Sequence, residues 1–233
     1  MTDTSYPVAG GTLRAYLATP TTPGPWPGVV VVHEAFGLTD DIRRQADRFA
    51  EAGYLALAPD LYDWGRTARC LVAAFKTLAT GRGRALEDIK AARTHLAERA
   101  DCTGRVGVIG FCLGGGLALL VASDGFDAAA PNYGQLPRHI DTVLAGGCPI
   151  VASYGGKDWT LRGAAGKLED SLTRVGVEHD VKEYADAKHG FLFEHTGKAT
   201  LGEPWMVKYD PAAADDAWAR IFAHFDDHLK EPT

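Results

Sequence analysis

Short apolar runs alternate with amphipathic stretches along most of the chain, a pattern typical of parallel strands joined by helices. Residues 29–33 (VVVVH) predict a central strand, because the segment is rich in β-branched residues and apolar on both faces. A second buried strand is expected at 54–58, and further strands are expected at 106–110, 149–154 and 179–184. The alternation predicts an α/β fold with a mostly parallel central sheet.

The segments between these strands predict helices on both faces of the sheet. Amphipathic periodicity covers residues 39–52, 84–100, 161–175 and 215–229, and a helix of small residues is expected at 113–123. Thr39 and Asp40 can cap the first helix, while Gly53 and Gly176 follow helix ends. Residues 61–80 predict a loop followed by a helix. No repeat, low-complexity tract or linker interrupts the pattern, so residues 1–233 are interpreted as one domain.

Composition and charge exclude several classes of protein. The chain has 233 residues, 46% of them hydrophobic, which suffices for the core of one large domain. The net charge of −6 and the scattered Lys and Arg residues argue against nucleic acid as a partner. The N-terminal segment lacks a secretory pattern, and no apolar run is long enough to cross a membrane, so a cytoplasmic location is expected. The cysteines lack disulfide or zinc spacing, so neither a metal nor a cofactor is predicted: Cys70, Cys102, Cys112 and Cys148.

The most informative segment is the predicted turn at Cys112. It reads Gly110-Phe-Cys112-Leu-Gly114 and leads from a buried strand into a helix, as in the G-x-nucleophile-x-G turn of α/β-hydrolases. Glycines two positions before and after the nucleophile let strand and helix pass closely, and a helix N-terminus favours a thiolate. Cys112 could instead be a small buried hydrophobe beside packing glycines. A dinucleotide-binding turn fits less well, because the glycine spacing is wrong.

An acid and a base follow the turn in the order that α/β-hydrolases use. Asp158 follows the strand predicted at 149–154, and His189 follows the strand at 179–184. Asp158 would orient His189, and His189 would exchange protons with Cys112 and the leaving oxygen. Alone, such an Asp is often a turn residue and such a His is often solvated. The remaining histidines considered are weaker candidates: His95, His139, His195, His224 and His228.

The loop after the first central strand, Glu34-Ala-Phe-Gly37, predicts half of an oxyanion hole. In this fold that loop and the residue after the nucleophile each supply a backbone N–H, which nominates Ala35 and Leu113. Glu34 would then point toward the thiol, where a carboxylate could take its proton or depress its reactivity. The alternative is a surface carboxylate that caps a turn.

Taken together, these motifs resemble the dienelactone hydrolase (carboxymethylenebutenolidase) family over nearly the whole chain. The matching segments are His33-Glu-Ala-Phe-Gly37, Ala58-Pro-Asp-Leu-Tyr62, Gly110-Phe-Cys-Leu-Gly-Gly115, Asn132-Tyr-Gly134, Gly155-Gly-Lys-Asp158, His189-Gly-Phe191 and Tyr209-Asp-Pro211. The resemblance implies an α/β-hydrolase fold and a triad of Cys112, His189 and Asp158. It also implies hydrolysis of enol-lactones in chlorocatechol-type aromatic degradation, and a monomer.

The resemblance also implies a role for Glu34. In the family an arginine holds this glutamate away from the thiol until a carboxylate-bearing substrate arrives, and the glutamate then deprotonates the cysteine. Arg66 or Arg69 could be that arginine here. Family members active on dienelactone carry a substrate-binding arginine where this chain has Phe193, and an apolar side chain cannot pair with an anion. The substrate is therefore expected to be a less anionic ester or lactone, in a pocket walled by Tyr133, Trp159 and Phe193.

The sequence thus predicts a hydrolase that uses a small lactone or ester and water, through an acyl-thioester on Cys112. Two other classes remain open. The same triad could serve a thioesterase or acyltransferase. The chain could also be a hydrolase-like protein that only binds a ligand or senses oxidants through its thiol.

Overall fold

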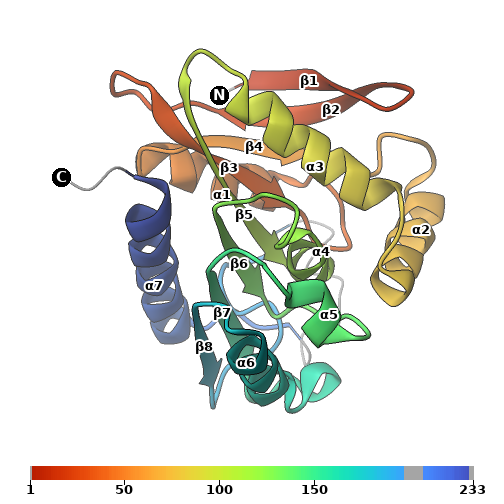
Figure 1. Ribbon diagram of the computed structural model, residues 1–233, viewed down its shortest axis with the longest axis vertical. Coiled ribbons are helices and arrows are strands. Elements are labelled where there is room, and N and C mark those ends of the chain that lie inside the picture. The colour runs from red at the N-terminus through yellow and green to blue at the C-terminus, as the bar shows by residue number, and fades with distance from the viewer. Residues whose placement is uncertain (1, 197–206, 231–233) are drawn as a thin grey trace.

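The centre of the molecule is a sheet of eight strands, in a computed structural model that describes residues 2–196 and 207–230 (Figure 1). Its strand order is β1-β2-β4-β3-β5-β6-β7-β8. The β1–β2 and β2–β4 pairs are antiparallel, and the pairs from β4 through β8 are parallel. The strands are β1 Thr2–Val8, β2 Gly11–Ala18, β3 Trp26–Val32, β4 Leu55–Pro59, β5 Cys102–Phe111, β6 Ala128–Asn132, β7 Ile150–Gly155 and β8 His179–Tyr184.

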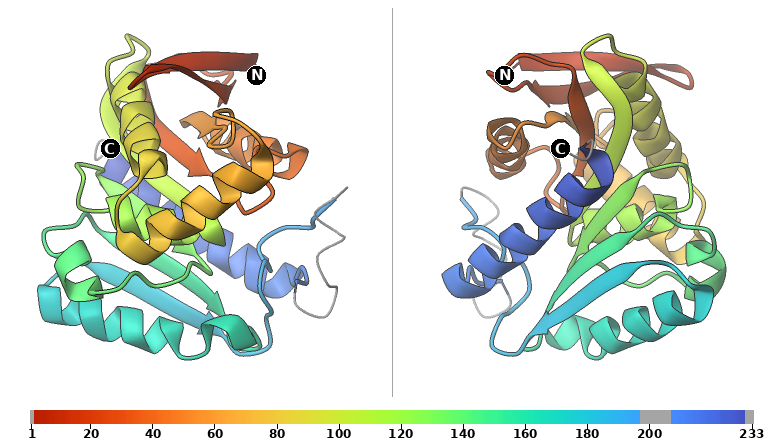
Figure 2. Two further views of the ribbon diagram at one scale, coloured as in Figure 1. Left: turned by 90° about the vertical axis from the view of Figure 1, so that its right-hand side faces the viewer. Right: turned by 60° about the vertical axis from the view of Figure 1, so that its left-hand side comes forward.

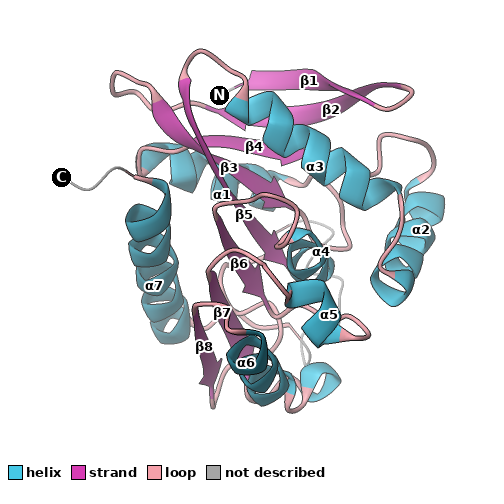
Figure 3. Cartoon of the chain, viewed as in Figure 1, coloured by secondary structure: helices cyan, strands magenta, loops and turns pink. Residues whose placement is uncertain are grey.

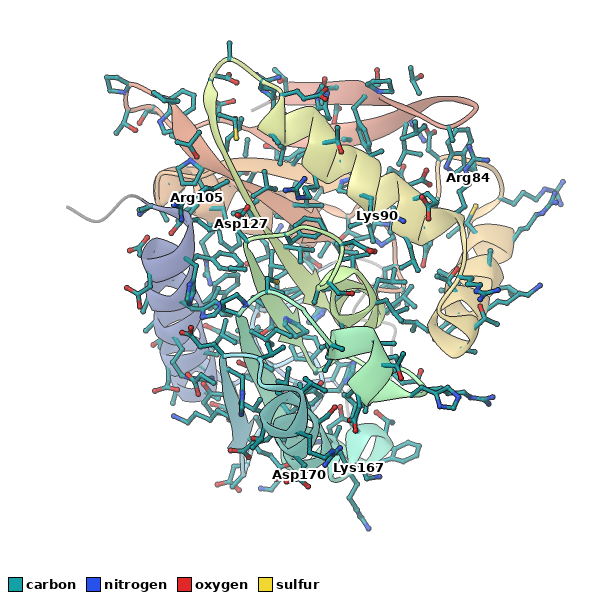
Figure 4. All side chains as sticks on the ribbon, viewed as in Figure 1. Arg84, Lys90, Arg105, Asp127, Lys167 and Asp170 are labelled. Atoms are coloured by element: carbon teal, nitrogen blue, oxygen red, sulfur yellow. The ribbon has the colours of Figure 1, made fainter. Side chains whose placement is uncertain are left out.

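Helices cover both faces of this sheet (Figures 1 and 3). On one face lie α1 (Asp40–Glu51) and α7 (Pro211–Leu229), and Figure 2 shows α7 as a long helix that runs along the sheet. On the other face lie α2 Thr67–Thr80, α3 Arg84–Ala97, α4 Leu113–Val121, α5 Ile140–Leu144 and α6 Ala164–Val175. A hydrophobic core fills the layer between the helices and the sheet on each face. The outer sides of the helices are polar, as Lys167 and Asp170 on α6 show (Figure 4). The predicted α/β architecture is confirmed.

Local sequence signals explain where several helices begin and end. The Thr39 side chain caps α1 by accepting a hydrogen bond from the Ile42 amide at 3.5 Å. The Asp210 side chain caps α7 by accepting a hydrogen bond from the Ala213 amide at 3.2 Å. Pro211 occupies the first turn of this helix. Gly176 ends α6 with a φ of 71°, a left-handed conformation that glycine adopts without a steric penalty.

Four elements were absent from the sequence-based expectation: β1, β2, β6 and α5. The β1–β2 hairpin lies at the edge of the sheet, and most residues of β1 are exposed, so no apolar run marks it. The β6 sequence AAAPN has low intrinsic strand propensity, and only burial between β5 and β7 makes it a strand. α5 has five residues, too few for a periodic pattern.

The strand order reverses direction at β3, because β4 lies on one side of it and β5 on the other. Open α/β sheets bind ligands at the carboxyl ends of the strands at such a reversal. The loops after β3 and β5 meet there, and they carry the Glu34–Ala35 and Cys112–Leu113 segments. Within the part of the chain that the structure describes, no helix combines the length and the apolar character needed to cross a bilayer.

Candidate active site

Cys112 occupies a strained turn between β5 and α4. Its φ of 54° and ψ of −114° lie outside the regions that residues with a side chain normally adopt. A Cβ at Gly110 would meet the Gly114 carbonyl oxygen at 2.0 Å, and a Cβ at Gly114 would meet the Val32 oxygen at 2.3 Å. Only glycine fits at both positions, so the turn depends on the two residues that the sequence pattern singled out.

Asp158 and His189 form a hydrogen-bonded pair although 31 positions separate them. Asp158 Oδ2 and His189 Nδ1 are 2.6 Å apart, and Asp158 follows β7 whereas His189 follows β8. The second carboxylate oxygen, Oδ1, accepts hydrogen bonds from the Thr160 amide at 3.0 Å and from its hydroxyl at 2.5 Å. Both oxygens of Asp158 are therefore satisfied, which fixes the carboxylate in front of the imidazole.

This pairing shifts both proton affinities. Burial alone would raise the pKa of Asp158, but hydrogen bonds from His189 and Thr160 hold it below its ordinary value. Burial opposes a charged His189, yet the hydrogen bond to Asp158 and the nearby Cys112 thiol raise its pKa to about 10. Asp158 therefore stays ionised, and His189 retains a proton readily. Cys112 is half-buried and faces the same cavity as His189, so its sulfur is accessible from that cavity.

The backbone at Ala35 is oriented by His33, a fully buried histidine. His33 Nδ1 lies 2.6 Å from the Glu34 carbonyl oxygen, and Nε2 lies 3.2 Å from the Leu61 nitrogen. Since the Leu61 N–H must donate to Nε2, the proton of the neutral ring sits on Nδ1 and donates to the Glu34 carbonyl. Burial lowers the pKa of His33, which favours this neutral form. The Glu34–Ala35 peptide, and with it the Ala35 N–H, is held in one orientation.

The second predicted oxyanion donor, Leu113, is the first residue of α4. Amides in the first turn of a helix have no partner inside the helix. The preceding amide, at Cys112, donates to the Asn132 carbonyl at 3.1 Å and is therefore occupied. The Leu113 N–H is thus suited to bind an oxyanion beside Cys112.

Glu34 pairs with His195, and the expectation that Arg66 or Arg69 would hold it is wrong. Both Glu34 carboxylate oxygens lie 3.1 Å from His195 Nε2, and both side chains are buried. Arg66 and Arg69 are exposed at the start of α2, and neither makes an ion pair with Glu34 in the described part of the chain. Burial opposes a charged His195, but Glu34 and Asp41 raise its pKa.

The segment that carries His195 is anchored to α1. Asp41, a buried carboxylate in the first turn of α1, accepts hydrogen bonds from the Thr196 amide at 2.9 Å and from the Thr196 hydroxyl at 2.7 Å. Arg44 neutralises the same carboxylate from one turn further along α1. Asp41 therefore fixes His195 in front of Glu34. The contact between Glu34 and His195 joins residues that are 161 positions apart.

A cavity of about 350 Å³ opens over Cys112 and His189. Its walls are mainly apolar, and no Lys or Arg lines it among the described residues: Phe75, Leu78, Cys112, Leu113, Tyr133, Gln135, Thr160, Leu161 and His189. Tyr133 thus lies where the sequence analysis expected it. In the described residues, no group of three His, Cys, Asp or Glu side chains is placed to hold a metal ion.

Two predicted pocket residues lie elsewhere. Phe193 is buried in the core, with its ring edge-on to Phe111 at a centroid distance of 5.2 Å and tilted against His195 at 4.7 Å. Trp159 is 57% exposed and does not line the cavity, although its neighbours Thr160 and Leu161 do. Sequence reasoning gave His33 and Thr160 no role and ranked His195 among the weaker candidates, because the partners of the two histidines, Leu61 and Glu34, lie in other loops. The only local signal is Thr160, two residues after Asp158 in a capping position.

A nucleophile turn between a strand and a helix, with an acid and a histidine after later parallel strands, defines an α/β-hydrolase. A sequence model of the dienelactone hydrolase family matches residues 13–229. The chain therefore belongs to the dienelactone hydrolase family, and it is a carboxylic ester hydrolase that acts with water on small esters or lactones.

Individual relatives match over almost their full lengths. The protein usf of Aquifex pyrophilus is 33% identical over 234 residues, covering 94% of this chain and 95% of the relative. A candidate carboxymethylenebutenolidase of Escherichia coli (strain K12) is 30% identical, covering 95% of this chain and 85% of the relative. The crystal structure of a candidate dienelactone hydrolase from Klebsiella pneumoniae superposes with a TM-score of 0.81 at 27% identity, covering 96% and 97% of the two chains.

Proposed function

We propose that Cys112, His189 and Asp158 act as a nucleophilic triad that hydrolyses a neutral, mainly apolar lactone or small ester. The observation that carries the proposal is the 2.6 Å hydrogen bond between Asp158 and His189, beside a cavity that both His189 and Cys112 line. A base held by a buried carboxylate next to an accessible thiol has the arrangement that activates a nucleophile.

The reaction proceeds in two steps through an acyl-thioester. The Cys112 thiolate attacks the carbonyl carbon, the Ala35 and Leu113 amides bind the oxyanion, and His189 gives a proton to the leaving oxygen as the C–O bond breaks. His189 then takes a proton from water, the hydroxide adds to the thioester, and the C–S bond breaks to release the acid. Asp158 stays ionised and stabilises the imidazolium in both steps.

Glu34 has a conditional role in this scheme. Both of its oxygens share the one N–H of His195 Nε2, and we propose that Glu34 reaches the Cys112 proton by leaving these hydrogen bonds. Those bonds are buried, so opening them leaves a carboxylate without its partner. We include Glu34 in the catalytic set as a second base whose availability His195 controls.

The cavity favours a neutral substrate. An anionic substrate needs a cation in the pocket, and no Lys or Arg lines this one among the described residues. The position expected to carry a substrate-binding arginine is Phe193, which packs against Phe111 in the core. Leu78, Leu113 and Leu161 line the cavity and provide apolar contacts for an acyl group. The E. coli relative, named as a candidate carboxymethylenebutenolidase, supports lactone chemistry. The monomeric state, the single-domain organisation and the cytoplasmic location stay predictions.

The test compares p-nitrophenyl acetate and dienelactone as substrates for the wild type, Cys112→Ala and Cys112→Ser. We expect the Ala variant to lose essentially all activity, the Ser variant to keep a fraction, and the wild type to favour the neutral ester. Cys70→Ala is the matched control, because Cys70 is a half-buried thiol outside the cavity. Wild-type rates in Cys112→Ala contradict the triad, and reversible oxidation of Cys112 without ester turnover supports a redox sensor instead.

A further inference from the structure

Tyr133 sits in a strained turn at the centre of the candidate site. It follows β6, and its φ of 39° lies in the left-handed region, which a residue with a side chain rarely adopts. The Tyr133 amide donates to the Ser153 carbonyl at 2.7 Å, and its ring lies edge-on to the His189 ring at a centroid distance of 5.1 Å. The strained backbone therefore places this ring directly beside the proposed base.

The turn is also pressed against the nucleophile helix. A Cβ at Gly134 would meet the Gly115 carbonyl carbon at 2.4 Å, so Gly134 and the first turn of α4 touch through their backbones. Because α4 begins immediately after Cys112, the position of Tyr133 relative to the thiol is set by backbone contacts. Tyr133 has little freedom to move away from the site.

The hydroxyl of Tyr133 has no hydrogen-bond partner among the described residues, although the residue is fully buried. The other buried tyrosine hydroxyls are all satisfied: Tyr6 donates to the Asp88 carbonyl at 2.8 Å, Tyr54 to Asp226, Tyr62 to the Ala35 carbonyl at 3.1 Å and Tyr154 to the Gly134 carbonyl at 3.2 Å. A buried hydroxyl without a partner is costly, and such groups gather at functional sites. Phenylalanine would fill the same space without that cost.

The Tyr133 side chain lies among the residues of the proposed triad. Tyr133 lines the cavity together with Cys112 and His189. Burial, followed by the nearby charges of Glu34 and Cys112, raises the pKa of Tyr133 well above its ordinary value. The hydroxyl therefore keeps its proton at neutral pH and can act only as a neutral donor or acceptor. A site that develops negative charge on the substrate needs such a donor.

We infer that the Tyr133 hydroxyl is a catalytic hydrogen-bond donor that contacts an oxygen of the bound ester or lactone. It joins the Ala35 and Leu113 amides as a third donor in the site. The inference rests on the proposed function, because it assumes that the acyl group attaches at Cys112. It also explains why the chain keeps a strained tyrosine with an unsatisfied hydroxyl at this position, which a purely packing role does not require.

The experiment uses Tyr133→Phe, which removes only the hydroxyl, and Tyr6→Phe as the matched control. Tyr6 is equally buried, its hydroxyl is bonded, and it lies on β1 at the edge of the sheet and not in the cavity. Thiol acylation is followed as the burst of p-nitrophenol from p-nitrophenyl acetate. Steady-state kcat and KM and the melting temperature are measured for each protein.

We expect Tyr133→Phe to lower the rate constant of the burst about 10- to 100-fold at saturating ester, with no loss of thermal stability. Tyr6→Phe should melt at a lower temperature with unchanged kinetics. A folded Tyr133→Phe that acylates within about twofold of the wild type overturns the inference while leaving the triad intact. A wild type with no burst dependent on Cys112 overturns the triad and the inference together, so the two failures are distinguishable.

Discussion

Gly114 offers a direct test of the close contact between α4 and β3. A Cβ at Gly114 would lie 2.3 Å from the Val32 carbonyl oxygen and 2.7 Å from the His33 carbonyl oxygen. Carbon and oxygen atoms normally approach to about 3.3 Å, so Gly114→Ala must push the start of α4 away from β3 by about 1 Å. Both obstacles are backbone oxygens, one at the end of β3 and one directly after it, so neither can rotate aside.

The expected cost follows from that displacement. Overpacking of this kind costs about 3 kcal/mol, which lowers the melting temperature of a chain of this size by about 6–12 °C. The same shift moves Cys112 and Leu113 relative to Ala35, and a misplacement of about 1 Å can reduce kcat about 100-fold. Differential scanning calorimetry and p-nitrophenyl acetate turnover measure the two effects.

Gly166→Ala is the matched control, since Gly166 lies within α6 and nothing comes within 4 Å of a Cβ built there. Alanine in an exposed helix should stabilise the chain by about 0.5–1 kcal/mol and leave kcat unchanged. If Gly114→Ala melts and turns over like the wild type, the backbone contact between α4 and β3 does not constrain the turn as described.

Two further predictions concern His33, which is buried, and His224, which is partly buried. His33→Leu should reduce the free energy of unfolding by about 2 kcal/mol, because the Leu61 amide loses its acceptor, and should lower kcat about tenfold, because the Glu34–Ala35 peptide loses a donor. Urea unfolding measures the first effect and ester kinetics the second. An unchanged kcat would show that His33 does not orient the Ala35 amide. Burial, and then the charge of His228, lower the pKa of His224 from 6.5 to about 4, so the unfolded chain binds a proton in this window that the folded chain does not. The free energy of unfolding should therefore fall by about 2 kcal/mol from pH 6.5 to pH 4, and His224→Phe should flatten that fall in urea titrations; an identical pH dependence in the variant would refute the assignment.

Most parallel strands and the long helices could be predicted, because β3, β4, β5 and β7 contain apolar runs and the long helices have their own periodicity. The segments at Cys112, Asp158 and His189 could be located for a similar reason, since each motif is local: glycines around the turn, and an acid and a histidine directly after strands. β6 could not be predicted, because its alanines have no strand propensity until β5 and β7 flank them.

The partner of Glu34 could not be predicted for a different physical reason. The choice between an arginine and His195 depends on how the segment at Thr196 docks on Asp41, and that contact spans 155 positions. The orientation of Phe193 follows from the same docking, because its ring packs between Phe111 and His195. Local patterns of residues along the chain do not reveal which distant segments come into contact in the tertiary structure.

The residues of the candidate site lie on five separate loops, and this has a consequence for the chain during its synthesis on the ribosome. Cys112 leaves the ribosomal exit tunnel well before His189, its proposed base, and the buried pair between Glu34 and His195 can form only after residue 195 has been synthesised. In the proposed mechanism, a nascent or truncated chain that ends before His189 therefore holds Cys112 without its base, and we expect such a chain not to hydrolyse esters. Recovery of turnover after denaturation should accordingly lag behind recovery of helical signal, because the last loops must dock before the first bond can be cut.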